Sequence, residues 1–275
     1  TGLTGFSKKY PSRFFDVGIA EQHAVTFAGG LAIQGIKPFV AIYSTFIQRA
    51  LDQVIHDIAL QKLPVVFCLD RAGLVGEDGA THHGVFDLSM MQMIPNMTVI
   101  APYCIEELEN ALEWASTYNE GPVVIRYPRG SAESDVTMNH PTVYGKSHTL
   151  QKGEKLSIVG VGAGVHIAKK TAFLIQESTG IQVSVINLSF VKPMDEDLIN
   201  ELIREKQPVI CIEENALYGG VGEHLAMILN PYQISVYPFA IPDHFVTHGA
   251  TQLLKKSLGL TPESVYDFIK DKNFI

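Results

Sequence analysis

The stretch PVVFCLDRAGLVGEDGATHHG, residues 64–84, joins an apolar run to a polar, glycine-rich segment. Residues 64–70 have the length and the β-branched content of a buried strand. Residues 71–84 are too long for a mere connection. Because open α/β sheets bind their ligands beyond the carboxyl ends of their strands, the stretch predicts an α/β fold with a site at that edge.

Similar runs continue on both sides of this stretch. The first half of the chain alternates predicted strands with helical segments, which is typical of a parallel sheet covered by helices. The predicted strands are 37–42, 64–70, 97–101 and 122–127, and the predicted helices are 20–31 and 105–115.

The alternation fades over residues 131–150, a polar stretch with Gly, Pro and His that we interpret as a linker. It then resumes, with strands predicted at 155–160, 181–187, 208–212 and 234–237, and helices at 165–179, 195–205, 222–229 and 250–258. We therefore predict an α/β protein of two three-layer domains. They are residues 1–130 and 151–275, joined by the linker.

Charge and hydropathy argue against two classes of partner, nucleic acids and membranes. The net charge of −8 argues against nucleic acid as a partner, because binding to phosphates needs clustered Lys and Arg. Residues 1–15 lack the layout of a signal peptide, and no apolar run reaches the roughly 18 residues that span a bilayer. We expect a soluble, cytoplasmic protein with no membrane partner. The start, which has no Met, favours a fragment or processed chain.

Two further patterns have ordinary explanations. The three cysteines are far apart and form no CxxC pair, so we expect buried thiols rather than a disulfide framework or a zinc site. Gly160-x-Gly162-x-Gly164 follows a predicted strand, as a dinucleotide-binding motif does. Its third glycine comes one position early and no acidic residue ends the next strand, so we favour a tight turn.

Specific motifs stand at the predicted strand and helix ends. Taken alone, Glu21 would be a solvated acid favoured by a helix dipole, and Phe46 a core residue. The segments that change this interpretation are, in chain order, FDVGIAEQHAV (15–25), YSTFIQRALDQ (43–53), DRAGLVGEDGATHHGVFD (70–87) and IRYPRG (125–130). Two more follow, NLSFVKPMDEDLI (187–199) and IEENALYGGVGEHL (212–225).

In that order the first four segments resemble the pyrimidine-binding domain of the 1-deoxy-D-xylulose-5-phosphate synthase family, and the last two resemble its C-terminal domain. The resemblance covers nearly the whole chain. It implies a transketolase-like pyrimidine-binding domain followed by a transketolase C-terminal-like domain. It also implies a thiamine-diphosphate-dependent transferase of isoprenoid and thiamine biosynthesis. Such an enzyme condenses pyruvate with glyceraldehyde 3-phosphate, releases CO2 and forms 1-deoxy-D-xylulose 5-phosphate.

The resemblance also implies roles around the cofactor. Glu21 is the carboxyl group that hydrogen-bonds N1′ of the aminopyrimidine, so that the 4′ nitrogen can deprotonate C2. This role requires an apolar surround that raises the pKa of the acid. Phe46 is expected to stack on the pyrimidine ring and Tyr43 to line the substrate pocket. Arg49 brackets the same segment and is a further candidate for the site, but it could equally be an ion-pair partner of Asp52 or a residue outside the site.

Other roles concern the substrates. His82 is the histidine expected to donate a proton near the reacting carbons, with its neighbour His83 as the alternative at this position. Asp78 is expected to contact the hydroxyls of the acceptor. Arg71 and Arg129 are expected to bind its phosphate, because a guanidinium group matches phosphate oxygens.

One departure from the family is large. Members bind Mg²⁺ and the diphosphate through a GDG motif and a downstream Asn on an N-terminal domain, and nothing in this chain matches that pattern. Glu77-Asp78-Gly79 only looks similar. We therefore expect no metal site in this chain. We also expect the chain to be a truncated, proteolysed or separately encoded part of the enzyme. It would be inactive until the missing domain is supplied, and a homodimer is expected.

Two alternatives remain open. One is another thiamine-diphosphate enzyme with the same two domains, such as a transketolase or the β subunit of a 2-oxo acid dehydrogenase. The other is a non-catalytic assembly module, against which the catalytic residue types retained in four motifs argue.

Overall fold

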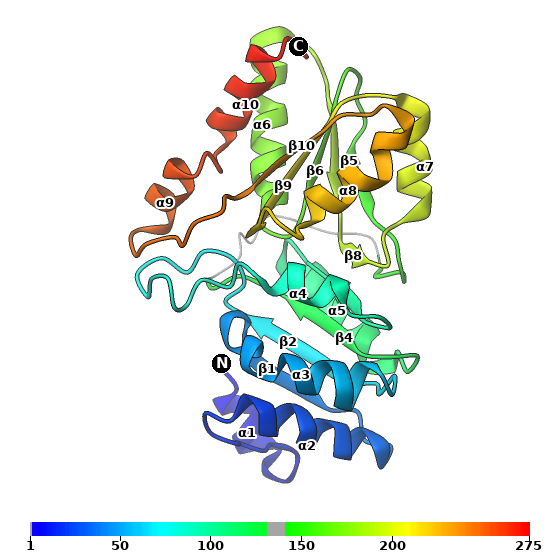
Figure 1. Ribbon diagram of the computed structural model, residues 1–275, viewed down its shortest axis with the longest axis vertical. Coiled ribbons are helices and arrows are strands. Elements are labelled where there is room, and N and C mark those ends of the chain that lie inside the picture. The colour runs from blue at the N-terminus through cyan, green and yellow to red at the C-terminus, as the bar shows by residue number, and fades with distance from the viewer. Residues whose placement is uncertain (1, 131–140) are drawn as a thin grey trace.

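The computed structural model describes residues 2–130 and 141–275 and contains two α/β units, one above the other in Figure 1. Residues 131–140 of the expected linker lie outside the described residues. Residues 148–150, also expected to be linker, belong to a strand of the second sheet.

The first unit contains the elements up to residue 130. Its strands are β1 (Phe39–Tyr43), β2 (Val66–Asp70), β3 (Thr98–Ile100) and β4 (Val123–Arg126). Its α-helices are α1 (Thr4–Lys9), α2 (Glu21–Ile33), α3 (Leu51–Gln53), α4 (Asp87–Met93) and α5 (Ile105–Thr117). A short 3-10 turn, η1 (Pro11–Arg13), follows α1, while η2 (Ser44–Ala50) and η3 (Val54–Ala59) flank α3 in one helical segment.

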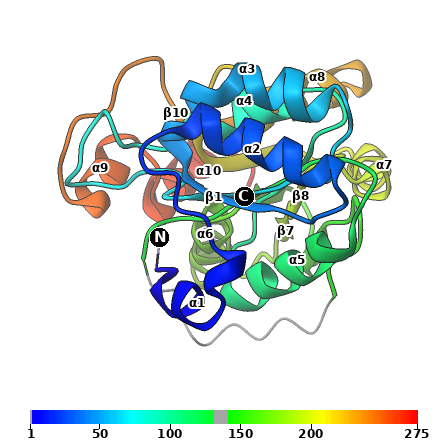
Figure 2. The same ribbon diagram turned by 90° about the horizontal axis from the view of Figure 1, so that it is seen from below.

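The first sheet has the order β1-β2-β4-β3-β8, in which β8 is Phe190–Lys192, and is covered on both faces. Successive strand residues point to opposite faces, so Phe67 and Leu69 pack with α2 and the α3 segment, while Val66 and Cys68 pack with α5. Figure 2 shows α2 and α3 on one side of β1 and α5 on the other. Burial on both faces explains why β2 is a continuous apolar run.

The second unit contains the described elements after residue 140, apart from β8. Its strands are β5 (His148–Gln151), β6 (Ser157–Gly160), β7 (Ser184–Asn187), β9 (Val209–Ala216) and β10 (Val236–Ile241). Its helices are α6 (Gly164–Thr179), α7 (Glu196–Glu205), α8 (Val221–Leu229), η4 (Asn230–Tyr232), α9 (Thr251–Ser257) and α10 (Pro262–Asp271). The sheet order is β10-β9-β6-β7-β5.

The two-domain α/β architecture is confirmed, but the prediction of a parallel sheet in the first half is wrong in one respect. Each sheet is mixed, because β8 (Phe190–Lys192) pairs antiparallel with β3, and β5 pairs antiparallel with β7. Both strands are only three or four residues long and have no extended β-branched run. Their strand conformation comes from pairing with a neighbour rather than from local propensity.

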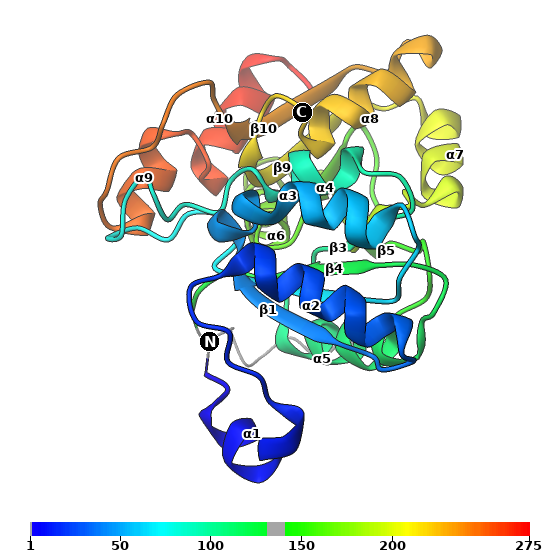
Figure 3. The ribbon, with the colours of Figure 1, turned by 60° about the horizontal axis from the view of Figure 1, so that its bottom comes forward.

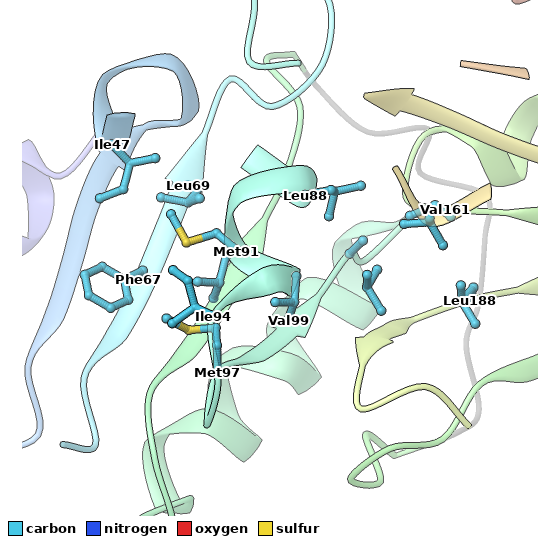
Figure 4. Close-up of a cluster of buried hydrophobic side chains, with 14 of the residues drawn as sticks. Ile47, Phe67, Leu69, Leu88, Met91, Ile94, Met97, Val99, Val161 and Leu188 are labelled. Carbon is cyan, nitrogen blue, oxygen red and sulfur yellow. The ribbon is translucent and has the colours of Figure 1, made fainter. Parts of the chain in front are cut away.

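The two units share a core. Strand β8 lies in the second half of the sequence but extends the first sheet. A buried cluster runs from Phe67 and Met91 in the first unit to Val161 and Leu188 in the second (Figure 4). The two units are therefore packed through apolar side chains and not merely tethered.

The minor sequence patterns have structural explanations. Burial raises the pKa of the Cys68 thiol to about 12 and also raises those of Cys104 and Cys211, so all three stay protonated. A side chain at Gly160 or Gly164 would collide with backbone atoms, which explains those glycines by close packing. No helix among the described residues is long and apolar enough to cross a membrane.

Candidate active site

The candidate site lies at the carboxyl edge of the first sheet. Strands β1, β2 and β4 are parallel, and the register pairs Tyr43 with Asp70 and Leu69 with Arg126. Parallel strands in register end together, so the segments that follow them meet at one edge. We call residues 71–84, which follow β2, the rim loop.

Glu21 is the first residue of α2 and is buried, with 8% of its surface exposed. Arg49 Nη1 donates to both carboxylate oxygens at 3.3 and 3.4 Å. Arg49 thus pairs with Glu21 rather than with Asp52, which pairs with His56. The missed contact joins a helix start to the end of η2, and sequence spacing gives no signal for it.

Aromatic rings lie at the same edge. The Tyr43 and Phe46 rings are nearly parallel, with centroids 5.5 Å apart, and the His82 ring meets the Phe46 ring edge-on at 5.4 Å. The Arg49 guanidinium carbon lies 5.2 Å from the Phe46 ring centroid, which connects this group to Glu21. The structure thus gathers Glu21, Tyr43, Phe46 and His82 in one place.

The two candidate phosphate arginines are held differently. Arg71 lies 3.8 Å from the Tyr43 ring centroid and pairs with Asp70, and its φ of 59° is an uncommon left-handed conformation for a residue with a side chain. Arg129 pairs with Asp78 at 3.0 Å, and both side chains are about half exposed. Such an exposed pair can be opened by an incoming anion at little cost.

The structure distinguishes the two neighbouring histidines. His82 presents its ring to Phe46, and its Nδ1 lies 2.8 Å from the Thr81 hydroxyl. His83 is 3% exposed, and both of its ring nitrogens are bonded to backbone groups of Val75 and Thr247. Only His82 is therefore available at the aromatic group.

Arg126 lies at the same strand end but is buried. Its Nε and Nη2 donate to the Asp87 carboxylate at 2.9 and 3.1 Å, and Nη2 also donates to the Glu214 carbonyl at 3.2 Å. The forked pair joins β4 to α4 within the first unit, and the bond to the Glu214 carbonyl joins β4 to the second unit. Arg126 thus has a structural role, unlike the exposed Arg129.

A pyrimidine fits the donor set of this edge. Among the described residues, Arg49 donates hydrogen bonds to the Glu21 carboxylate. The guanidinium group of Arg49 also lies over the ring of Phe46. A buried carboxylate next to an aromatic ring can bind a heterocycle through one hydrogen bond and stacking. Across residues 2–130 and 141–275, no group of three or more His, Cys, Asp or Glu side chains could hold a metal ion.

Comparison with known families identifies this class of protein. Residues 1–134 match the transketolase pyrimidine-binding domain, and residues 145–265 match the transketolase C-terminal domain. The chain belongs to the transketolase family, whose enzymes use thiamine diphosphate, and it comprises these two domains.

Similar individual proteins include 1-deoxy-D-xylulose-5-phosphate synthases. The enzyme of Clostridium perfringens strain 13 is 48% identical over 271 residues, which are 96% of this chain and 43% of that protein. The Thermomicrobium roseum enzyme is 48% identical over 269 residues, with the same coverage. The chain therefore spans about two fifths of the length of these relatives.

A solved structure is also similar. It is described as a split-gene transketolase in an inactive β4 tetramer, and it aligns with a TM-score of 0.87 at 30% identity. The alignment covers 98% of this chain and 88% of that chain.

Proposed function

We propose that this chain is the pyrimidine-binding and C-terminal part of a 1-deoxy-D-xylulose-5-phosphate synthase. The observation that carries the proposal is the buried Glu21 carboxylate, which lies with the Phe46 ring and His82 at one sheet edge. The 48% identity to synthases over nearly the whole chain supports this reaction.

Thiamine diphosphate, when bound, supplies the nucleophilic carbon and accepts the electrons that decarboxylation of pyruvate releases. Glu21 holds a proton at pyrimidine N1′, while the neighbouring Arg49 guanidinium limits where that carboxyl group can move. Phe46 stacks on the pyrimidine and excludes water from this hydrogen bond.

The remaining residues handle the acceptor. Tyr43 lines the pocket, and Arg71 and Arg129 bind the phosphate of glyceraldehyde 3-phosphate. Asp78 exchanges its bond to Arg129 for the acceptor hydroxyls. His82 donates a proton to the aldehyde oxygen as the carbon–carbon bond forms.

The Mg²⁺ and diphosphate ligands belong to a part of the enzyme that this chain does not contain. The chain covers 43% of the Clostridium perfringens enzyme but 88% of the split-gene transketolase chain. We therefore propose that activity needs a diphosphate-binding region like the one that these synthases have outside the matched part, in an assembly containing at least two copies of each region.

Reconstitution tests the proposal. The chain is mixed or co-expressed with the region of the Clostridium perfringens enzyme that it does not match, together with thiamine diphosphate, Mg²⁺, pyruvate and glyceraldehyde 3-phosphate. We expect CO2 release and formation of 1-deoxy-D-xylulose 5-phosphate. A complex that assembles and binds thiamine diphosphate but forms no such product would contradict the proposed reaction.

A transketolase subunit is the second candidate, because the split-gene transketolase is similar over almost the whole chain. Its reaction transfers a two-carbon unit from a ketose phosphate and releases no CO2. Incubating the same complex with a ketose phosphate and an aldose phosphate distinguishes the two. Transfer without decarboxylation of pyruvate would favour the transketolase.

A further inference from the structure

The rim loop, residues 71–84, is held by the second unit as well as by the first. Leu74 N–H donates to the Glu214 carboxylate at 3.1 Å, and Glu214 also pairs with Lys255. Gly249 N–H donates to the Gly76 carbonyl at 3.2 Å. Figures 1 to 3 all show the cyan rim loop beside the orange segment around α9.

His83 makes the third connection and lies inside the loop. Val75 N–H donates to His83 Nδ1 at 3.1 Å, and His83 Nε2 lies 3.1 Å from the Thr247 carbonyl oxygen. A backbone N–H can only donate and a carbonyl can only accept, so Nδ1 carries no proton and Nε2 carries one. One neutral tautomer satisfies both contacts, and it joins two points of the loop to the second unit.

The residues proposed to act on the acceptor are close to this connection. His82 precedes His83 directly, and the N–H groups of both residues bond to the Gly79 carbonyl, next to Asp78. A shift of His83 would therefore move His82 relative to Phe46, and Asp78 relative to Arg129. Six of the fourteen residues of the loop are at least partly exposed, namely Arg71, Glu77, Asp78, Ala80, Thr81 and His82. Five of these six lie between residues 77 and 82, so this part of the loop depends on its backbone hydrogen bonds and on His83 for its position.

We propose that His83 is a positioning residue, through which the second unit sets the place of His82 and Asp78 in the acceptor site. This inference rests on the proposed function for the roles of His82 and Asp78. His83 itself does not touch the substrate. It acts by holding the rim loop against the backbone of Thr247.

The test uses three variants of His83 and a matched control. H83A removes both contacts, whereas H83N and H83Q each place an amide where one of the ring nitrogens lies and so retain one contact. The control is H166A, because His166 Nε2 also lies 2.8 Å from a backbone carbonyl of the other unit, that of Tyr103, far along the chain from the loop. Folding of each variant is checked by thermal unfolding.

Two readouts are combined. In the chain alone, H83A should raise hydrogen exchange of amides 73–84 by at least about tenfold, with H83N and H83Q in between and H166A unchanged there. In the reconstituted enzyme, H83A should raise the KM for glyceraldehyde 3-phosphate about tenfold or more and leave the KM for pyruvate within about twofold.

These readouts separate the two proposals. If the wild-type complex makes no 1-deoxy-D-xylulose 5-phosphate, the proposed function fails, and loop exchange alone then decides whether His83 positions the loop. If H83A folds and leaves loop exchange and the acceptor KM unchanged, the positioning role is overturned. Equal increases in both KM values would also overturn it, because the effect would not be specific to the acceptor.

Discussion

Both α/β units place a carboxylate against the N-terminus of a helix beside their sheet, yet the two carboxylates have different surroundings. Glu213, in β9, is fully buried and accepts hydrogen bonds from the N–H groups of Val221 and Gly222 at the start of α8. Glu21 starts α2 and has the half-exposed Arg49 as its partner. Glu213 is satisfied by the backbone, whereas Glu21 is held by one side chain that can move.

This difference shows how one architecture can serve two purposes. At the edge of the first sheet, the rings and charged groups are partly exposed and available to a ligand. At the edge of the second sheet, Glu213, Glu214 and Asn215 are buried, and Glu214 bonds to the rim loop. The second edge is used for packing between the units, and this packing supports the first edge.

The largest effect is expected from removing the Glu21 carboxylate, which tests whether Glu21, unlike Glu213, serves catalysis. In the reconstituted enzyme, E21A should lower CO2 release from pyruvate about 10⁴-fold, or ~5 kcal/mol in the barrier, because no group then holds a proton at N1′. E263A, which removes an exposed acid from the first turn of α10, is the control. Near-normal turnover by E21A would refute its catalytic role.

The buried arginine of β4 gives the next largest effect. R126M leaves Asp87 buried and without its cation, so the free energy of unfolding of the isolated chain should fall by about 3–5 kcal/mol. Urea denaturation measures this change. A loss below about 1 kcal/mol would show that the buried Arg126–Asp87 pair does not stabilise the fold.

The third prediction concerns pH and Glu213, whose pKa burial raises to about 7 from its ordinary value of 4.5. Between these values the folded chain keeps a proton that the unfolded chain releases. The free energy of unfolding should therefore fall as pH rises through this window, by up to ~3 kcal/mol, and then level off. E213Q, which cannot titrate, should flatten this slope. Urea denaturation between pH 5 and pH 8 tests it, and an equal slope in both proteins would contradict the assignment.

The smallest effect on stability is expected from R129M. Its ion pair with Asp78 is half exposed, so the free energy of unfolding should change by less than about 1 kcal/mol. The same variant should raise the KM for glyceraldehyde 3-phosphate in the reconstituted enzyme. Together, R126M and R129M test whether Arg126 serves stability while Arg129, three residues later, serves binding of the acceptor.

The sequence predicted the architecture, and it also predicted that the candidate residues meet at one sheet edge, because both depend on local patterns. Apolar runs locate the buried strands, and the polar segments that follow β1 and β2 must meet where parallel strands end. The resemblance added specific roles for Glu21 and His82, and these stay proposals.

Other features could not be predicted, because they depend on contacts between distant segments. Arg49 bonds to Glu21 across 28 positions, although Asp52 is nearer in sequence. The connection from His83 to Thr247 joins segments 164 positions apart. Strands β5 and β8 are too short to show a period and become visible only through their pairing partners.

Strand β8 limits how the chain can be divided. It shields the outer edge of β3, so a truncated protein ending at residue 130 would present that edge, with its free N–H and C=O groups, to other molecules. Exposed edges of this kind recruit further strands and cause aggregation. We therefore expect a version shortened at residue 130 to aggregate, unless residues 190–192 or another edge-covering segment are retained beside β3.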